Sequence, residues 1–180
     1  EKSNHDHTDR IRALHGDGNY VYCAYDDTSI LSYSTDANGG LTLEQENNAA
    51  HQGDGSGGAK SYGIWTDGNF VYAGLQYFGL ATYEASAGPG PANGLGLVNV
   101  QPNGPHSDLP DFVDQDIYFE LKQITGDDTF LYAALGSYGV ATYQRNVDGS
   151  LTFVGLNYTD AASMDVGLTV YTEDVFKFPS

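Results

Sequence analysis

The residues best suited to chemistry are a few cations in an otherwise acidic chain. Its 180 residues include 24 Asp and Glu but only seven Lys and Arg, which gives a formal net charge of −17. Four of the seven cations stand at or just before the starts of three related strand-like segments: Arg10, Arg12, Lys60 and Lys122. Because clustered cations attract anions, we expect a locally positive channel mouth that binds a small anion or an acidic sugar.

Three residues of this group fall at equivalent positions of the related segments: Arg12, Tyr62 and Lys122. The segments must lie side by side for these residues to share one site. The acidic residues nearest in sequence offer the cations ion pairs instead: Asp9, Asp116 and Glu120. Ligand binding and internal ion pairing are therefore both open interpretations.

The histidines are candidates for a second class of function, catalysis of hydrolysis. Four of the five lie in long polar segments, at His5, His7, His51 and His106. A hydrolase would need one of them, with His51 and His106 the best candidates, within hydrogen-bond reach of an Asp or Glu. The chain has no G-x-S-x-G motif, no P-loop and no Cys–His pair. Enzymatic activity stays undecided, and the sequence favours non-enzymatic binding of a ligand or partner over a lactonase-like hydrolase.

Two segments carry potential metal ligands. The run "HDHTD" has alternating ligands, although a flexible terminus is the preferred interpretation. A second run offers the hard oxygens that Ca²⁺ prefers, at Asp108, Asp111, Asp114 and Asp116. It lacks the spacing of a calcium loop, so an acidic surface loop is favoured. We predict no cofactor, with calcium the one ion left open.

Aromatic residues in the connecting loops have two interpretations. Tyr77, Phe78 and Tyr138 follow the second strand-like run of their segments. Exposed, they form a platform on which a sugar or another ring stacks; buried, they pack the loops.

A repeated unit positions all of these residues. Asp17–Tyr33, Asp67–Tyr83 and Asp127–Tyr143 align without a gap. Each begins with a turn, continues with an aromatic–aliphatic–Tyr run, and ends in a strand that closes on Tyr. Strand-like segments precede and follow each block, so one unit is four short strands with a period of 50 to 60 residues.

Four short strands per repeat are typical of a propeller blade. In "FVYAG" both alternating sets of side chains are apolar or small, as expected of a sheet covered on both faces. Small residues would let neighbouring sheets approach: Ala24, Ala73, Gly74, Ala133 and Ala134. A β-sandwich does not need this fixed period, and solenoid coils are usually shorter. We therefore expect an all-β propeller.

The unit "DGNFVYAGLQYFGLATYE" with its later "DGSLTFVG" resembles the blades of phosphogluconolactonase-type propellers. It is also similar to the LVIVD-type repeat of bacterial surface and secreted propellers. The resemblance covers the scaffold positions of three units. It implies a propeller fold and, in the lactonase relatives, about seven blades and a sugar-lactone site. No catalytic residue of that family matches a position of this chain.

Three blades cannot close a ring, because propellers have about four to eight. We expect one domain, 1–180, with blades at about 10–46, 60–101 and 120–156 and a partial fourth repeat at 164–180. A homodimer would then form a six-bladed ring, unless the chain is a fragment of a longer propeller. The fourth repeat is either a strand that exchanges with the partner or the remnant of a truncation.

Composition excludes one class of partner and bears on the compartment. Phosphate backbones require clustered Lys and Arg, so nucleic acid is excluded. No apolar run reaches the roughly 18 residues of a membrane span. The acidity favours a secreted or periplasmic setting. The single cysteine, Cys23, is expected to be a small buried apolar residue.

Overall fold

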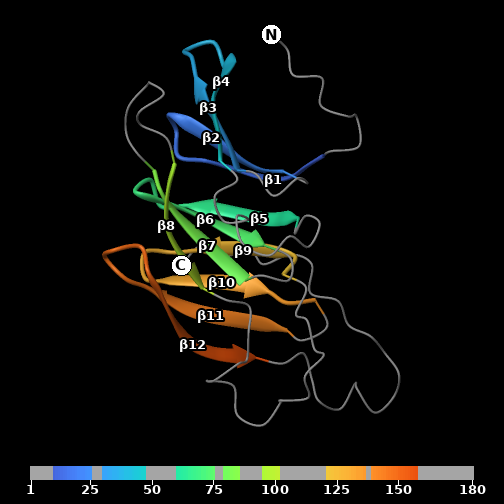
Figure 1. Cartoon of the computed structure of the whole chain (residues 1–180), viewed down its shortest axis with the longest axis vertical. Coiled ribbons are helices and arrows are strands. Elements are labelled where there is room, and N and C mark those ends of the chain that lie inside the picture. Colours follow the sequence, from blue (N-terminus) through green and yellow to red (C-terminus); the bar gives the residue numbers. More distant parts are fainter. Residues whose placement is uncertain are drawn as a thin grey trace.

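The described part of the chain forms three separate four-stranded antiparallel sheets, shown in Figure 1. The computed structural model describes residues 10–25, 30–47, 60–75, 79–85, 95–101, 121–136 and 139–157. The first sheet contains β1 (Ile11–Gly16), β2 (Tyr20–Tyr25), β3 (Ile30–Thr35) and β4 (Leu41–Asn47). The second contains β5 (Ser61–Thr66), β6 (Phe70–Leu75), β7 (Gly79–Glu84) and β8 (Gly96–Gln101). The third contains β9 (Gln123–Gly126), β10 (Phe130–Ala134), β11 (Val140–Arg145) and β12 (Leu151–Asn157).

Each sheet comes from one sequence repeat, and its strands are ordered as in the chain. The first strands, β1, β5 and β9, are the edges at which neighbouring sheets contact one another. In Figure 1 the sheets follow one another along the long axis, and β4 and β12 lie at opposite ends. Among the described strands, none is hydrogen-bonded to a strand of another repeat, which confirms the expected all-β, propeller-like arrangement.

A repeated aspartate holds the turn between the first two strands of each sheet. Asp17 Oδ1 accepts hydrogen bonds from the backbone N–H groups of Asn19 and Tyr20, at 2.9 and 2.8 Å. Asp67 and Asp127 make the same pair of bonds in the other sheets. An Asp side chain that bonds the backbone two residues on favours such a turn. The role of the repeated Asp is therefore structural.

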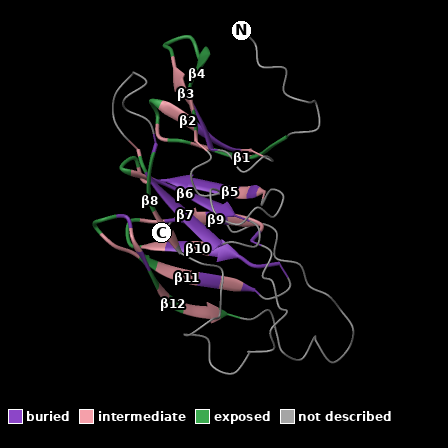
Figure 2. Cartoon of the chain, viewed as in Figure 1, coloured by how far each residue is buried: buried purple, intermediate pink, exposed green. Residues whose placement is uncertain are grey.

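In the middle sheet, β5 to β7 are mostly buried, as Figure 2 shows in purple, whereas β8 is largely exposed. Val71 and Ala73 of β6 pack toward the first sheet, in one apolar core with Tyr22. Tyr72 faces the third sheet, in a second core with Leu131. This confirms the prediction made from "FVYAG". The small residues named from the sequence are also buried: Ala24, Ala73, Gly74, Ala133 and Ala134.

Cys23 is buried and unpaired with any other cysteine, and burial raises the pKa of its thiol. The part of the chain that the structure describes has no helix long and apolar enough to cross a membrane. The predicted fourth repeat, 164–180, lies outside the described residues, and the predicted domain boundaries remain predictions.

Tyrosines that are buried, or partly buried as Tyr143 is, give the fold an expected alkaline limit. Burial raises the pKa of Tyr143 to about 12, and it raises the pKa of Tyr22 and Tyr72 as well, with a further contribution from the nearby Asp17 and Asp67. An unfolded tyrosine titrates near pH 10, so above that pH the native state binds more protons than the unfolded chain. Stability should be complete below about pH 10 and lost as the pH rises toward 12.

The loss from Tyr143 alone should be on the order of 2–3 kcal/mol, since one pKa unit corresponds to about 1.4 kcal/mol. Urea unfolding at a series of pH values, read together with tyrosinate absorbance, measures it. Constant stability across this range, or full tyrosine ionisation at about pH 10 in the folded protein, would contradict the prediction.

Candidate functional site

Arg12, Tyr62 and Lys122 meet on the inner edges of the three sheets. The Arg12 guanidinium carbon lies 5.0 Å from the centre of the Tyr62 ring. The Lys122 ammonium lies 5.4 Å from the same ring centre. The structure thus joins one residue from each repeat, as their equivalent sequence positions suggested. We call these three residues the inner-edge cluster.

Backbone irregularities place the inner-edge cluster. The pairing of β1 with β2 shifts register between Ile11 and Ala13, which leaves Arg12 at a β-bulge. β5 has the same shift between Ser61 and Gly63, at Tyr62. A bulge leaves the extra residue out of the ladder and re-aims its side chain. Lys122 immediately precedes β9, and its N–H donates to the Ala134 carbonyl at 2.9 Å.

The cluster is open enough for a ligand to reach. Arg12 is exposed, whereas Tyr62 and Lys122 are half-buried. A cation within about 6 Å of a tyrosine ring is attracted to it, and the Tyr62 ring has two such cations, one from the first repeat and one from the third. Two positive charges around one ring make the local potential positive, which favours an anion.

The other predicted site residues are less informative. Arg10 is exposed and Lys60 is half-buried, both near the same strand starts. The remaining four lie outside the described residues: His51, His106, Tyr77 and Tyr138. So do Phe78 and the candidate calcium ligands Asp108, Asp111, Asp114 and Asp116, as well as the acidic ion-pair partners considered above. Within the described ranges, no group of three His, Cys, Asp or Glu is arranged to hold a metal.

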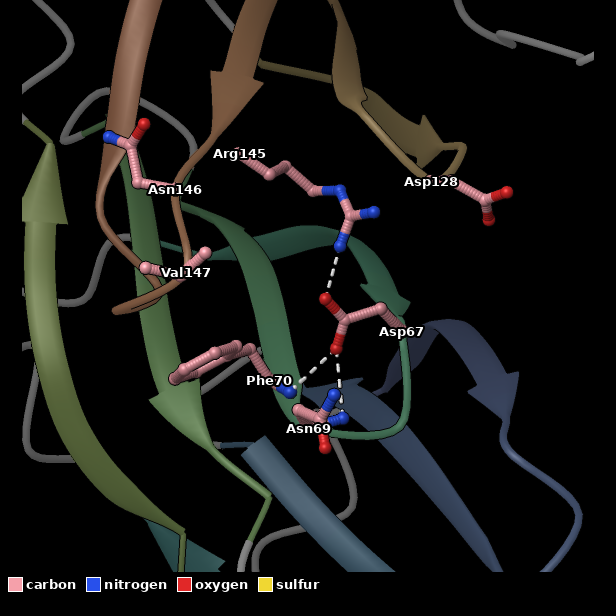
Figure 3. A pocket seen from close by; sticks show the side chains of 7 residues that line it. All are labelled: Asp67, Asn69, Phe70, Asp128, Arg145, Asn146 and Val147. Atoms are coloured by element: carbon pink, nitrogen blue, oxygen red, sulfur yellow. Dashed lines mark hydrogen bonds and ion pairs between the residues drawn. The ribbon is translucent and has the colours of Figure 1, made fainter.

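A second feature, which the sequence did not reveal, is a cleft between the second and third sheets (Figure 3). It has a volume of about 460 Å³ and a polar lining dominated by one ion pair, Arg145 with Asp67. The rest of the lining consists of Asn69, Phe70, Asp128, Asn146 and Val147.

Arg145 connects the two sheets at this cleft. Its guanidinium donates to the Asp67 carboxylate and to the Asp127 carbonyl, and it lies 4.9 Å from the Trp65 ring centre. The Arg145 and Asp67 side chains are only 9% and 17% exposed. Both terminal nitrogens of the guanidinium are bonded to the protein, and Nε is buried with no hydrogen-bond partner among the described residues. We therefore interpret Arg145 as a link between the two sheets.

In the other two sheets a tyrosine hydroxyl makes the contact with the turn aspartate that Arg145 makes in the second sheet. Tyr22 and Tyr132 donate their hydroxyls to Asp17 and Asp127, at 3.1 and 3.0 Å. In the second sheet Arg145 binds the corresponding oxygen of Asp67, and the Tyr72 hydroxyl has no hydrogen-bond partner in the residues that the structure describes. The sequence signal is an arginine at the position that Thr35 and Ala85 occupy in the other repeats.

One histidine lies at the junction of the first two sheets. His15 Nδ1 accepts a hydrogen bond from the Thr66 N–H at 3.3 Å, and its ring lies 6.0 Å from Trp65. Burial lowers the pKa of His15, against an opposing effect of Asp17. A neutral imidazole that accepts a backbone hydrogen bond is a packing element, so His15 does not supply the base that a hydrolase needs.

Comparisons with known proteins support the fold. No family model and no curated protein sequence matches the chain. Among solved structures it is similar to the periplasmic gluconolactonase PpgL of Pseudomonas aeruginosa, with a TM-score of 0.60 and 16% identity over 81% of this chain and 39% of that one. It is also similar to a protein from Lactobacillus plantarum, with a TM-score of 0.58 and 18% identity over 80% of this chain and 40% of that one.

At these identities the likeness shows a propeller-like fold and nothing of the activity. The chain spans less than half the length of either neighbour. A resemblance to LVIVD-type repeats has no counterpart among these structures and stays a prediction.

Proposed function

We propose that the protein binds a small carboxylate-bearing ligand, such as a sugar acid, at the inner-edge cluster. The observation that carries the proposal is the convergence of Arg12 and Lys122, from two different sheets, on the Tyr62 ring of the sheet between them. Two cations in one place are unusual in a chain with a net charge of −17.

The donor chemistry supports this ligand class. An arginine side chain has five N–H donors in a planar fork and a lysine side chain has three. Each therefore keeps donors for a ligand after it has bonded one partner within the protein. A carboxylate accepts such charge-assisted bonds strongly, and arginine binds it through two parallel bonds. The Tyr62 ring adds a flat apolar surface with a polar tip, which suits a sugar ring. Arg10 and Lys60 would extend the positive surface.

Titration calorimetry with D-gluconate tests the proposal. We expect saturable binding that weakens as salt is added, because exposed charges are screened. Arg12→Ala and Lys122→Ala should each weaken binding by about tenfold or more, since a charge-assisted hydrogen bond contributes about 1.5–3 kcal/mol. Tyr62→Phe, which keeps the ring, should bind much as the unmodified chain does.

Glu84→Gln is the charge control, because it changes the net charge by one unit at an exposed residue outside the cluster. A general charge effect would make Glu84→Gln strengthen binding about as much as Arg12→Ala weakens it. Absence of gluconate binding, with galacturonate and inorganic phosphate also failing to bind, would refute an anion site at the cluster.

A lactonase-like hydrolase is the second candidate, favoured by the structural likeness to the gluconolactonase PpgL. It would require a base among His51, His106 and the carboxylates of the same long segments. The two candidates differ in a direct assay: a pH-stat measures acid release from glucono-lactone. Binding alone predicts the buffer rate, whereas a hydrolase accelerates release and loses that acceleration on His51→Ala or His106→Ala.

The proposal extends to the assembly and the compartment. A homodimer closing a six-bladed ring would bring two inner-edge clusters around one axis and strengthen the positive field. A secreted or periplasmic location fits the acidic composition, and the neighbour PpgL is periplasmic by its description. The proposed binding requires no cofactor. Calcium held by the acidic run Asp108–Asp116 would be the one exception, and adding EDTA tests for it.

A further inference from the structure

The first sheet has an apolar face that no other described sheet covers. We call the side of a sheet that faces the preceding sheet in chain order its leading face, and the opposite side its trailing face. Cross-strand pairs place Leu14 beside Cys23 and Leu43 beside Tyr33 on the leading face of the first sheet. On this face the residues of the outer strands β1 and β4 are exposed, at 66% for Leu14, 57% for Leu41 and 54% for Leu43. Cys23 and Leu31 of the inner strands β2 and β3 are buried.

At two of these three positions the equivalent residues of the other two sheets are buried. The equivalents of Leu43 are Leu97, which is 37% exposed, and the half-buried Phe153. Leu14 corresponds to Ile64 and Ile124, which are 4% and 3% exposed. Leu41 corresponds to Leu95 and Leu151, which are 5% and 6% exposed. Figure 2 shows the same contrast, with β4 exposed and β5 to β7 mostly buried. The first sheet therefore presents a leading face with the same apolar positions and no described sheet against it.

The two internal junctions show what such a face packs against. Ile64 and Leu95 share a core with Tyr22, Ala24 and Ile30 of the first sheet's trailing face. Ile124 and Leu151 share the other core with residues of the second sheet's trailing face, Tyr72 and Leu80. At both junctions the trailing face contributes to the core a tyrosine of its second strand and an aliphatic residue near the start of its third strand.

The trailing face of the third sheet has the same two types of residue. Tyr132 and Val140 are the equivalents of Tyr72 and Leu80, and both are half-buried. Tyr132 is held by Asp127 just as Tyr22 is held by Asp17. One chain thus has one leading face and one trailing face without a described neighbouring sheet. At the two junctions within the chain, a leading face packs against a trailing face in the same way.

We infer that the leading face of the first sheet docks on the trailing face of the third sheet of a second copy. Two such contacts close a ring of six sheets, within the range of known propellers. Each face measures roughly 19 Å by 17 Å, or about 300 Å², from strand spacing and rise. Four faces then bury about 1,200 Å², which exceeds the area of most crystal contacts and meets that of a specific interface. This inference rests on the proposed ring closure but not on the anion site.

Light scattering of the 180-residue chain at micromolar concentration tests the inference. The expected mass is twice the chain mass of 19.3 kDa. Leu14→Glu combined with Leu41→Glu should give a monomer whose circular dichroism and Trp65 fluorescence are unchanged. Both leucines are already exposed, so folding of the chain does not depend on them.

Val147→Glu is the matched control, because Val147 is fully exposed on the turn after β11 and belongs to neither face. It should remain a dimer. A monomer for the unmodified chain, or a dimer that survives the double substitution, would overturn the inference. Gluconate binding is measured separately, so a dimer without binding would refute the anion site alone.

Discussion

Arg145→Ala is expected to destabilise the protein by about 3 kcal/mol, because removing one partner of a buried ion pair leaves the other charge without compensation. The substitution removes the cationic partner of the Asp67 carboxylate at the junction of two sheets, while the two backbone hydrogen bonds to that carboxylate remain. It also removes the side chain that lies over the Trp65 ring. The cost is at the lower end of the range for buried pairs, since the Tyr72 hydroxyl can take over the oxygen that Arg145 releases.

The single tryptophan makes this prediction easy to measure. Trp65 contacts the arginine directly, so urea unfolding followed by its fluorescence reports on the junction itself. Arg145→Lys is the control, because it keeps the charge but not the planar fork, and it should cost less than Arg145→Ala. The repeats add a further test: Asp67→Asn should be less harmful in the Arg145→Ala background than alone. A loss below about 1 kcal/mol for Arg145→Ala, as for an exposed ion pair, would contradict the assigned role.

Gly63→Ala is expected to cost about 3 kcal/mol, since overpacking a closed interface forces backbone to move. A methyl group built at Gly63 would lie 2.7 Å from the Ile124 nitrogen and 2.9 Å from the Gln123 Cα. Both atoms belong to the backbone of β9 and cannot rotate away. The inner edges of the second and third sheets would have to separate, and Lys122 would shift with them.

Gly96→Ala is the matched control for this substitution. Gly96 also lies in a strand of the second sheet, but a methyl group there meets nothing within 4 Å. It should leave stability unchanged or raise it by about 0.5–1 kcal/mol, because alanine costs less backbone entropy than glycine. Thermal unfolding of both variants measures the difference. Equal stability of Gly63→Ala and Gly96→Ala would show that the sheets do not approach as closely as described.

The repeated part of the fold could be predicted from the sequence because its local rules act three times. The aspartate of each turn, the strand with apolar or small side chains on both faces, and the small residues all lie at fixed spacing. A feature that is unclear in one repeat can therefore be read from the other two. The same alignment predicted that Arg12, Tyr62 and Lys122 occupy equivalent positions. Their contact then follows from sheets that pack with their first strands together.

The contact between Arg145 and Asp67 could not be predicted in this way. It joins residues 78 apart in sequence and occurs in only one of the two described junctions. Aligning the repeats highlights the residue types that all three have in common. Arg145 has no arginine as its counterpart in the other two repeats, so the alignment does not point to it. The β-bulges that place Arg12 and Tyr62 were also not predicted, because a register shift leaves no fixed sequence pattern.

A crystal structure of the chain grown with D-gluconate tests the anion site most directly. We expect the carboxylate of gluconate between the Arg12 guanidinium and the Lys122 ammonium, with the sugar chain along the Tyr62 ring. Gluconate held elsewhere, with these two cations both turned away from it, would refute the anion site.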